Sequence, residues 1–234
     1  MGLAISLVLI GLGALFTALF IYGKLTNYSW RTTMFKTIDS LLFLALGIFL
    51  FFFKGQPKIG IFIILGLVFG LLGDVALAFK RIDKSKDKFF TLLGMVMFII
   101  GHIFYTSGLF VNYYVPGNAL YVIIPLVVAV LIAITIVIIE LKLKFNLGNF
   151  KYFGILYFGA LFSVSMSCLS LNILYQFNNI FLILMLVGSL IFASSDILLT
   201  RTYFKENCPK GFLISTSVTY YVAQFLIAFT LFFL

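Results

Sequence analysis

Eight apolar runs divide the sequence, and each is about as long as a bilayer is thick. They cover residues 3–22, 37–53, 59–79, 89–112, 119–140, 150–171, 179–200 and 212–234. A helix needs about 20 apolar residues to cross the hydrocarbon core of a membrane. Because 63% of the residues are hydrophobic and only 10% are charged, the chain lies far outside the range of soluble proteins. The runs therefore predict an integral membrane protein with eight transmembrane helices.

The predicted fold class is all-α, a polytopic membrane bundle. In lipid the backbone must satisfy its own hydrogen bonds, and the alternating pattern of a membrane β-barrel is absent. The connections between the runs are at most about 15 residues long, which is too short for a separate soluble domain. We therefore expect one eight-helix transmembrane domain over residues 1–234.

The net charge of +9 is gathered on one side of this predicted bundle. Only Lys54 and Lys58 lie on the other side. The remaining 14 of the 16 basic residues lie in the connections that follow the odd-numbered runs: Lys24, Arg31, Lys36, Lys80, Arg81, Lys84, Lys86, Lys88, Lys142, Lys144, Lys151, Arg201, Lys205 and Lys210. The positive-inside rule places these connections in the cytoplasm and both termini outside it. Membrane topology thus accounts for the charge, and we expect membrane lipids rather than nucleic acid as partners.

Two acids interrupt the apolar runs at matching depths. Asp74 is the one charged residue of the run 59–79, roughly 8 Å from its cytoplasmic boundary, and Asp196 lies at a similar depth in the run 179–200. A carboxylate in hydrocarbon costs several kcal/mol or more unless it is paired, hydrated or protonated, so its presence favours a function. Other polar residues fall near this layer or closer to mid-membrane: Lys36, Asp39, His102, Tyr157 and Gln224. We expect a polar cavity open toward the cytoplasmic leaflet.

A weak internal repeat relates the two halves of the chain. Asp74 and His102 are 28 residues apart, as are Asp196 and Gln224, so an offset of 122 residues superimposes the two pairs. Four plus four helices in the same orientation would place the acids in equivalent positions around an axis along the membrane normal. Small residues beside the acids favour close helix packing: Gly66, Gly70, Gly73, Ser194 and Ser195.

Six stretches carry a resemblance to a known family. They are "FKTIDSLL", "GLLGDVALAF", "GMVMFIIGHIFY", "YFGALFSVSM", "SLIFASSDILL" and "YYVAQFLIA", which follow one another nearly from end to end. In these the chain resembles the YhhN-like membrane proteins, which include the lysoplasmalogenases. Thr37 departs from the family's pattern, in which proline commonly follows the lysine. The resemblance implies hydrolysis of the vinyl ether bond of a lysoplasmalogen to a fatty aldehyde and a glycerophospho-choline or -ethanolamine.

Two carboxyl groups suit that chemistry without a metal or a cofactor. Vinyl ethers hydrolyse by protonation of carbon, followed by attack of water on the resulting cation, so the site needs one carboxylic acid and one carboxylate. Two close carboxyl groups in apolar surroundings titrate in separate steps, which lets both forms coexist. Asp74 and Asp196 are the predicted catalytic pair, and the sequence leaves open which of them is the acid.

The resemblance also suggests residues that bind the lysophospholipid substrate. These are Lys36, Asp39, His102, Tyr105, Tyr157, Tyr221 and Gln224. Lys36, with Arg81 or Arg201, would hold the lipid phosphate. The tyrosines and Gln224 would orient water or the glycerol hydroxyl. A lone histidine among apolar residues, here His102, is more often structural than catalytic.

Two other interpretations remain open at this stage. Intramembrane acids on repeated bundles also serve as relays in proton- or cation-coupled transporters of small molecules, a role that Asp74 and Asp196 would fit. Against it, the only proline in the middle of a run is Pro125, so paired helix breaks are absent. A homologue could also keep the fold and act on another lipid or on none. The oligomeric state is not readable from the sequence.

Overall fold

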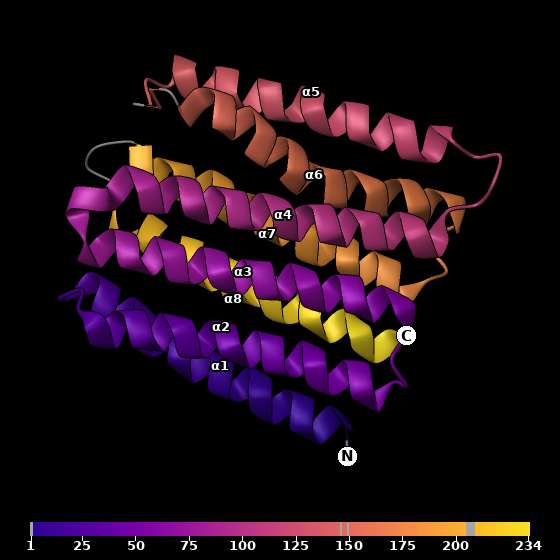
Figure 1. Cartoon of the computed structure of the whole chain (residues 1–234), viewed down its shortest axis with the longest axis horizontal. Coiled ribbons are helices and arrows are strands. Elements are labelled where there is room, and N and C mark those ends of the chain that lie inside the picture. Colours follow the sequence, from indigo (N-terminus) through magenta and orange to yellow (C-terminus); the bar gives the residue numbers. More distant parts are fainter. Residues whose placement is uncertain (1, 146, 149, 205–208) are drawn as a thin grey trace.

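The fold is an all-helical membrane bundle, as the apolar runs predict (Figure 1). The computed structural model describes residues 2–145, 147–148, 150–204 and 209–234. Within these ranges eight helices are long and apolar enough to cross a membrane, and there is no strand. They are α1 (Gly2–Leu25), α2 (Trp30–Phe53), α3 (Lys58–Ile82), α4 (Asp87–Tyr113), α5 (Leu120–Lys142), α6 (Phe150–Leu174), α7 (Ile180–Phe204) and α8 (Lys210–Phe229). Two 3₁₀ turns, Lys84–Lys86 and Thr230–Phe233, precede α4 and follow α8.

Helix α2 begins seven residues before the apolar run that predicts it. Its first turns are polar, so hydropathy alone does not find them. Ser29 precedes the helix in an extended conformation, and its backbone N–H donates to Thr32 Oγ1 at 3.3 Å. This capping interaction stabilises a helix start outside the apolar segment. It carries Lys36 on regular helix toward the interior of the bundle.

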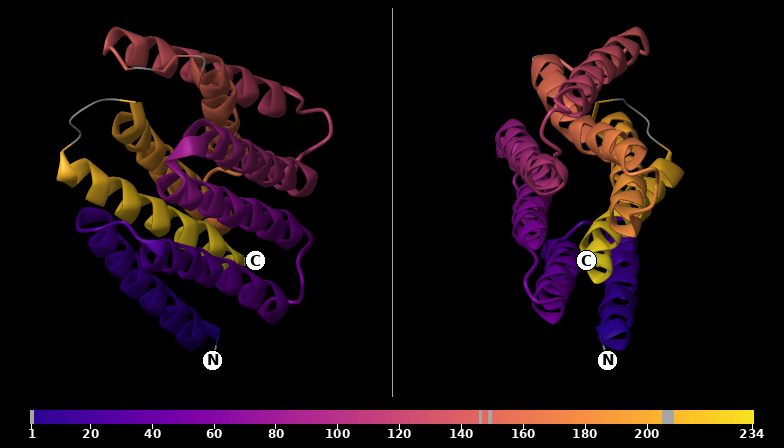
Figure 2. Two further views of the ribbon diagram at one scale, coloured as in Figure 1. Left: turned by 60° about the vertical axis from the view of Figure 1, so that its left-hand side comes forward. Right: turned by 90° about the vertical axis from the view of Figure 1, so that its right-hand side faces the viewer.

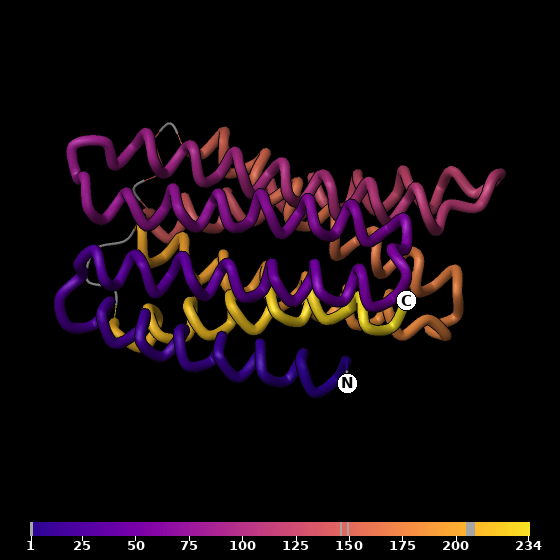
Figure 3. Tube along the Cα trace, turned by 60° about the horizontal axis from the view of Figure 1, so that its bottom comes forward, coloured from indigo at the N-terminus to yellow at the C-terminus, as the bar shows by residue number. Residues whose placement is uncertain are grey.

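The helices form two layers (Figure 2). One layer holds α2, α3 and α4, the other holds α1, α8, α7 and α6, and α5 lies at the outer edge beside α6. Helix α8 contacts both α2 and α3, and α4 contacts α6 across the two layers. The C-terminal ends of α1, α3, α5 and α7 lie at one end of the bundle, and the ends of the described chain lie at the other (Figures 1 and 3). The described basic residues near these helix ends thus share one end, as the sequence predicts, and Lys205 lies outside the described residues.

Packing follows the predicted repeat. Four helix contacts of the first half have equivalents in the second half. Helix α1 contacts α2 as α5 contacts α6, and α2 contacts α3 as α6 contacts α7. Likewise α3 contacts α4 as α7 contacts α8, and α2 contacts α8 as α6 contacts α4. A second correspondence is residue-specific. Gly66 packs against Tyr105, and Gly188 packs against Ile227, which are the positions 122 residues further along. These equivalent contacts support a 4+4 arrangement with the register that relates Asp74 to Asp196.

One face of α3 is lined by glycines that admit large side chains from its neighbours. A Cβ atom at any of three positions would overlap a neighbouring side chain: Gly66 with the ring of Tyr105, Gly70 with the amide of Gln224, and Gly73 with the ring of Phe98. Small residues therefore bring α4 and α8 close to α3, as predicted. The face ends at Asp74, one residue after the last of these glycines.

Candidate functional site

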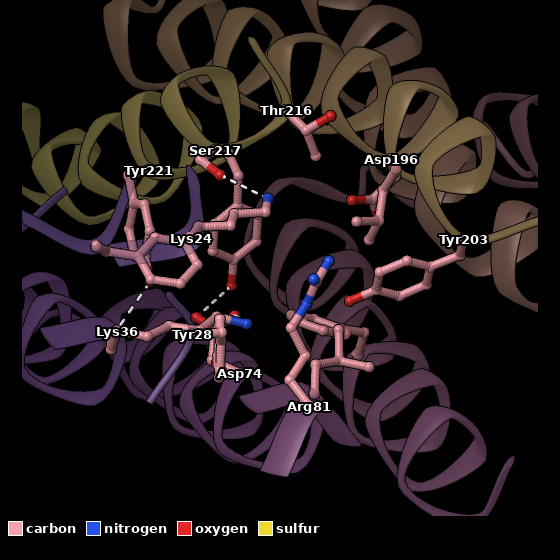
Figure 4. Close-up of a pocket in the computed structure, with 15 residues that line it drawn as sticks. Lys24, Tyr28, Lys36, Asp74, Arg81, Asp196, Tyr203, Thr216, Ser217 and Tyr221 are labelled. Atoms are coloured by element: carbon pink, nitrogen blue, oxygen red, sulfur yellow. Dashed lines mark hydrogen bonds and ion pairs between the residues drawn. The ribbon is translucent and has the colours of Figure 1, made fainter. Parts of the chain in front are cut away.

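A cavity lies between the two layers, toward the end of the bundle that carries the described basic residues; the space not filled by protein atoms within its lining is about 550 Å³ with open solvent included (Figure 4). Side chains from α1, α2, α3, α4, α7 and α8 line it. They are Phe20, Lys24, Tyr28, Lys36, Asp74, Leu77, Arg81, Phe98, Asp196, Leu199, Tyr203, Thr216, Ser217, Tyr220 and Tyr221. The two intramembrane acids thus face one interior cavity from opposite layers, the arrangement expected from their matching depths.

Asp74 is surrounded by hydrogen-bond donors. Its Oδ1 lies 2.9 Å from Lys36 Nζ, and the exposed fractions of the two side chains are 2% and 11%. Its Oδ2 accepts from Ser40 Oγ at 2.6 Å and from Tyr220 OH at 2.7 Å. An ammonium group and two hydroxyl donors form an environment suited to a carboxylate. The three donors around Asp74 are therefore those expected around a carboxylate.

A further set of hydrogen bonds orients these donors. Gln224 Nε2 donates to Tyr220 OH at 2.9 Å, and Gln224 itself packs on Gly70 of α3. Tyr221 OH donates to the backbone oxygen of Lys36 at 3.2 Å. Because Gln224 donates to a lone pair of the Tyr220 oxygen, the hydroxyl proton of Tyr220 is directed toward Asp74.

Asp196 has a different environment, although it is also buried, with 4% of its surface exposed. Tyr157 OH, from α6, donates to its Oδ2. Ser195 Oγ lies 3.3 Å from its Oδ1 and 2.8 Å from the backbone oxygen of Phe192, and its single proton serves one of them at a time. In the described part of the chain no lysine or arginine forms an ion pair with Asp196. The cavity therefore places a charge-paired carboxyl group opposite an unpaired one.

Five of the residues predicted from sequence lie outside the cavity lining: Asp39, His102, Tyr105, Tyr157 and Gln224. Tyr157 and Gln224 contribute the hydrogen bonds given above. The other three have separate surroundings. Asp39 faces α1, where it accepts a hydrogen bond from Thr17 Oγ1 at 2.5 Å. His102 packs edge-on against the ring of Phe192. Its Nδ1 is 2.6 Å from the Phe98 backbone oxygen, so this nitrogen carries a proton and donates it. Tyr105 is buried against the glycine face of α3, and its hydroxyl has no partner among the described residues. These positions support the helix packing around the site.

Basic side chains other than Lys36 also reach the cavity. Arg81 lines it, whereas Arg201, the alternative partner considered for the lipid phosphate, does not. Lys24 Nζ donates to Ser217 Oγ at 3.0 Å within the lining (Figure 4). Three cationic side chains thus line the same cavity, each from a different helix: Lys24 from α1, Lys36 from α2 and Arg81 from α3. No group of three or more potential metal ligands of the His, Cys, Asp and Glu types occurs in the ranges described.

Sequence analysis missed three polar residues of this region. Ser40 and Tyr220 donate directly to Asp74. Tyr220 precedes Gln224 by four residues and so shares its helix face, a spacing that could have identified it. The third is Glu140, which is 5% exposed and stands in the last turn of α5. It ends the most apolar run of the chain, a place where a charged residue usually marks only the membrane boundary.

Glu140 lines a second chamber that adjoins the cavity; the space not filled by protein atoms within its lining is about 580 Å³ with open solvent included. The two spaces share five lining residues: Leu77, Phe98, Asp196, Leu199 and Tyr203. The lining of the second chamber is largely aromatic and aliphatic, with Thr91 and Thr200 as its hydroxyl groups besides two tyrosines. Asp196 therefore stands where a polar cavity meets an apolar chamber.

The sequence model of the YhhN family matches residues 31–231, which includes α3 to α8 and all of α2 except its first residue. No curated protein and no solved structure matches the chain. The matched range contains both acids and all their hydrogen-bond partners.

Proposed function

The chain belongs to the YhhN family, and from this premise we propose that it hydrolyses the vinyl ether bond of lysoplasmalogens. The observation that carries the proposal is the pair of buried acids in one cavity, one of them paired with a lysine and the other without an ion-pair partner among the described residues. Acid-catalysed vinyl ether hydrolysis requires one protonated and one ionised carboxyl group. The products are a fatty aldehyde and a glycerophospho-alcohol.

The reaction starts with proton transfer to carbon. The acid donates its proton to the β-carbon of the C=C–O group, which leaves a cation shared between the adjacent carbon and the ether oxygen. Water adds to that carbon and loses a proton, which gives a hemiacetal. The hydroxyl group of the hemiacetal then loses its proton as the bond to the glycerol oxygen breaks and that oxygen takes up a proton, which releases the aldehyde and the alcohol. The proton lost by the attacking water restores the acid. The sum is the addition of one water molecule, without an oxidant or a reductant.

The two environments suggest the assignment of roles. Asp196, which has no ion-pair partner among the described residues, serves as the acid, and its hydrogen bond from Tyr157 fixes the orientation of the carboxyl group. Asp74, held by Lys36 and Tyr220, serves as the carboxylate that stabilises the cation and accepts the proton of the attacking water. Fixed charges aimed at a developing cation are effective because they need no reorganisation during the reaction.

The surroundings of the cavity also suit a single-chain lipid. Arg81 lines the cavity and offers positive charge for the phosphate, with Lys36 committed to Asp74. A groove of about 980 Å³ between α1 and α8 is lined almost entirely by apolar side chains and shares Tyr221 with the cavity. A hydrocarbon chain placed in this groove would remain in an apolar environment while the ether group reached the acids.

Charge asymmetry suggests which leaflet supplies the lipid. The cavity lies toward the end of the basic connections, which we propose to be cytoplasmic, with both termini outside the cytoplasm. In that orientation the substrate enters from the cytoplasmic leaflet. The oligomeric state does not enter the proposal.

The test is aldehyde release from the purified protein in detergent. We expect wild-type protein to release aldehyde from an alkenyl lysophospholipid and both Asp74→Asn and Asp196→Asn to lower the rate by the ~10²–10⁴-fold typical of lost general acid–base catalysis. Asp83→Asn is the matched control, because Asp83 lies in the connection between α3 and α4 and should leave the rate unchanged.

Two results would count against the proposal. If folded wild-type protein releases no aldehyde, the hydrolase assignment is wrong, and proton-coupled flux in liposomes becomes the next experiment. If either Asn variant keeps a near-normal rate, the role given to that residue is wrong.

A further inference from the structure

The chamber next to Asp196 combines an aromatic lining with a second carboxyl group. Six of its lining residues are aromatic: Phe98, Phe150, Tyr157, Phe158, Tyr203 and Phe204. Besides Asp196 it holds one other acid, Glu140, and its described lining includes no lysine or arginine. A carboxyl group within an aromatic lining is the combination that recognises ammonium ions, because both the carboxylate and the ring faces attract a cation.

Glu140 is buried without full hydrogen bonding. Its exposed fraction is 5%, and its Oε1 has no hydrogen-bond partner among the described residues. A buried acceptor without a partner destabilises a fold, and the penalty is larger if the group is charged. This oxygen is itself buried, but Glu140 lines the chamber, so a cation bound in the chamber can neutralise the carboxylate and pair with it after a small side-chain rotation. An alkyl chain in the same place would leave this oxygen unpaired.

The position of the chamber fits a lipid head group. Glu140 lies two residues before the end of α5, Phe150 is the first residue of α6, and Phe204 is the last residue of α7. The chamber therefore extends from Asp196 toward the polar end of the bundle, where head groups lie. It shares Phe150, Phe204 and three other residues with an open surface cleft of about 1,070 Å³ that contains Lys80 and Lys88. This cleft offers a route to the chamber.

We propose that this chamber binds the ammonium end of the lipid head group and that Glu140 makes the protein prefer amine-bearing lysophospholipids. The inference rests on the proposed function, since it names which part of the substrate occupies which space. The ethanolamine ammonium group donates a hydrogen bond to the carboxylate of Glu140, and a quaternary choline group interacts with the carboxylate and the aromatic rings through charge alone. Glu140 is a specificity residue in this account and takes no part in bond cleavage.

A head-group comparison tests the preference. The substrates are three alkenyl lysophospholipids with the same chain and an ethanolamine, choline or glycerol head group. Glu140→Gln keeps the shape of the side chain and removes its charge, and we expect kcat/KM to fall about tenfold or more for the two amine lipids and less than about twofold for the glycerol lipid. Lys142→Gln, on the exposed last residue of the same helix, is the matched control and should change none of the three. An equal loss on all three lipids, or no loss on any, would overturn the inference.

A binding experiment separates this inference from the proposed function. The probes are alkyl ether lysophospholipids, which have no vinyl ether and cannot be cleaved by this chemistry, with choline or glycerol head groups. We expect the choline probe to raise the melting temperature of wild-type protein in detergent more than the glycerol probe does, and Glu140→Gln to abolish that difference. If this holds while no aldehyde is formed from alkenyl lipids, the amine site stands and the hydrolase proposal fails. If aldehyde is formed while the two probes act equally, the amine site is wrong and the hydrolase proposal stands.

Discussion

Breaking the ion pair between Lys36 and Asp74 is the perturbation whose cost the structure defines best. The two charged atoms lie 2.9 Å apart, and both side chains are largely removed from solvent. At an effective dielectric constant of about 20, Coulomb attraction at this distance is about 6 kcal/mol. The desolvation of the two ions offsets much of it, at several kcal/mol per ion. The net contribution of the pair is therefore small, whereas an unpaired partner is expensive.

A double-mutant cycle measures this difference. Lys36→Met leaves the carboxylate of Asp74 without its cation, and Asp74→Asn leaves the ammonium group of Lys36 without its anion. Each single change should lower the free energy of unfolding by roughly 3 kcal/mol or more, the usual cost of breaking a buried pair. The double variant removes both charges and should lose much less than the sum, so we expect a coupling energy of at least about 2 kcal/mol.

The measurement is reversible unfolding in mixed micelles, with denaturing detergent as the titrant and helical circular dichroism as the readout. The exposed pair Lys86–Asp83, with 3.9 Å between the charged atoms, provides the control cycle, for which we expect a coupling energy below about 1 kcal/mol. A coupling energy for Lys36 and Asp74 no larger than that of the control would refute the argument that Lys36 holds Asp74 as an anion.

Three further changes test the packing, the hydrogen bonding and the topology. Gly66→Ala should lower the free energy of unfolding by about 1–3 kcal/mol, because the new methyl group overlaps the ring of Tyr105. Gly159→Ala, whose methyl group would meet no neighbouring atom within 4 Å, should be neutral or slightly stabilising. Unfolding in detergent measures both. Tyr220→Phe removes one of the three donors to Asp74 and should slow aldehyde release by roughly tenfold with little change in KM. An unchanged kcat would show that this hydroxyl group has no role in catalysis. A cysteine introduced at Lys84 should react with a membrane-impermeant thiol reagent only after sealed cells are opened, and labelling of intact cells would reverse the proposed orientation.

Hydropathy predicts most of the architecture because bilayer thickness sets the length of each helix. It also predicts the depth of Asp74 and Asp196, since a helix rises 1.5 Å per residue. The rotation of each helix about its own axis and the choice of neighbours depend on side-chain packing. For that reason the sequence indicates that Lys36 lies near the level of Asp74, but it does not reveal that the two form an ion pair.

Residues behind the cavity show the same limit. His102 and Tyr105 have the depth expected of site residues, yet His102 packs against Phe192 and Tyr105 packs against the glycine face of α3. Glu140 is missed for the opposite reason: it stands at the end of a run, where charge is ordinary, and only the packing of α5 beside α6 encloses it. Whether a side chain is buried depends on which helices pack around it, and this cannot be read from a single apolar run.

The measurement that tests the central claim most directly is hydrolysis in heavy water with analysis of the aldehyde by mass spectrometry. If a carboxylic acid of the cavity protonates carbon, the acid exchanges with solvent before each turnover, and the promptly trapped aldehyde carries one deuterium at carbon 2. The same step should give a normal solvent isotope effect on the rate, since transfer of the proton to carbon is the slow step. An enzyme-formed aldehyde without deuterium at carbon 2 would contradict acid-catalysed vinyl ether hydrolysis by Asp74 and Asp196.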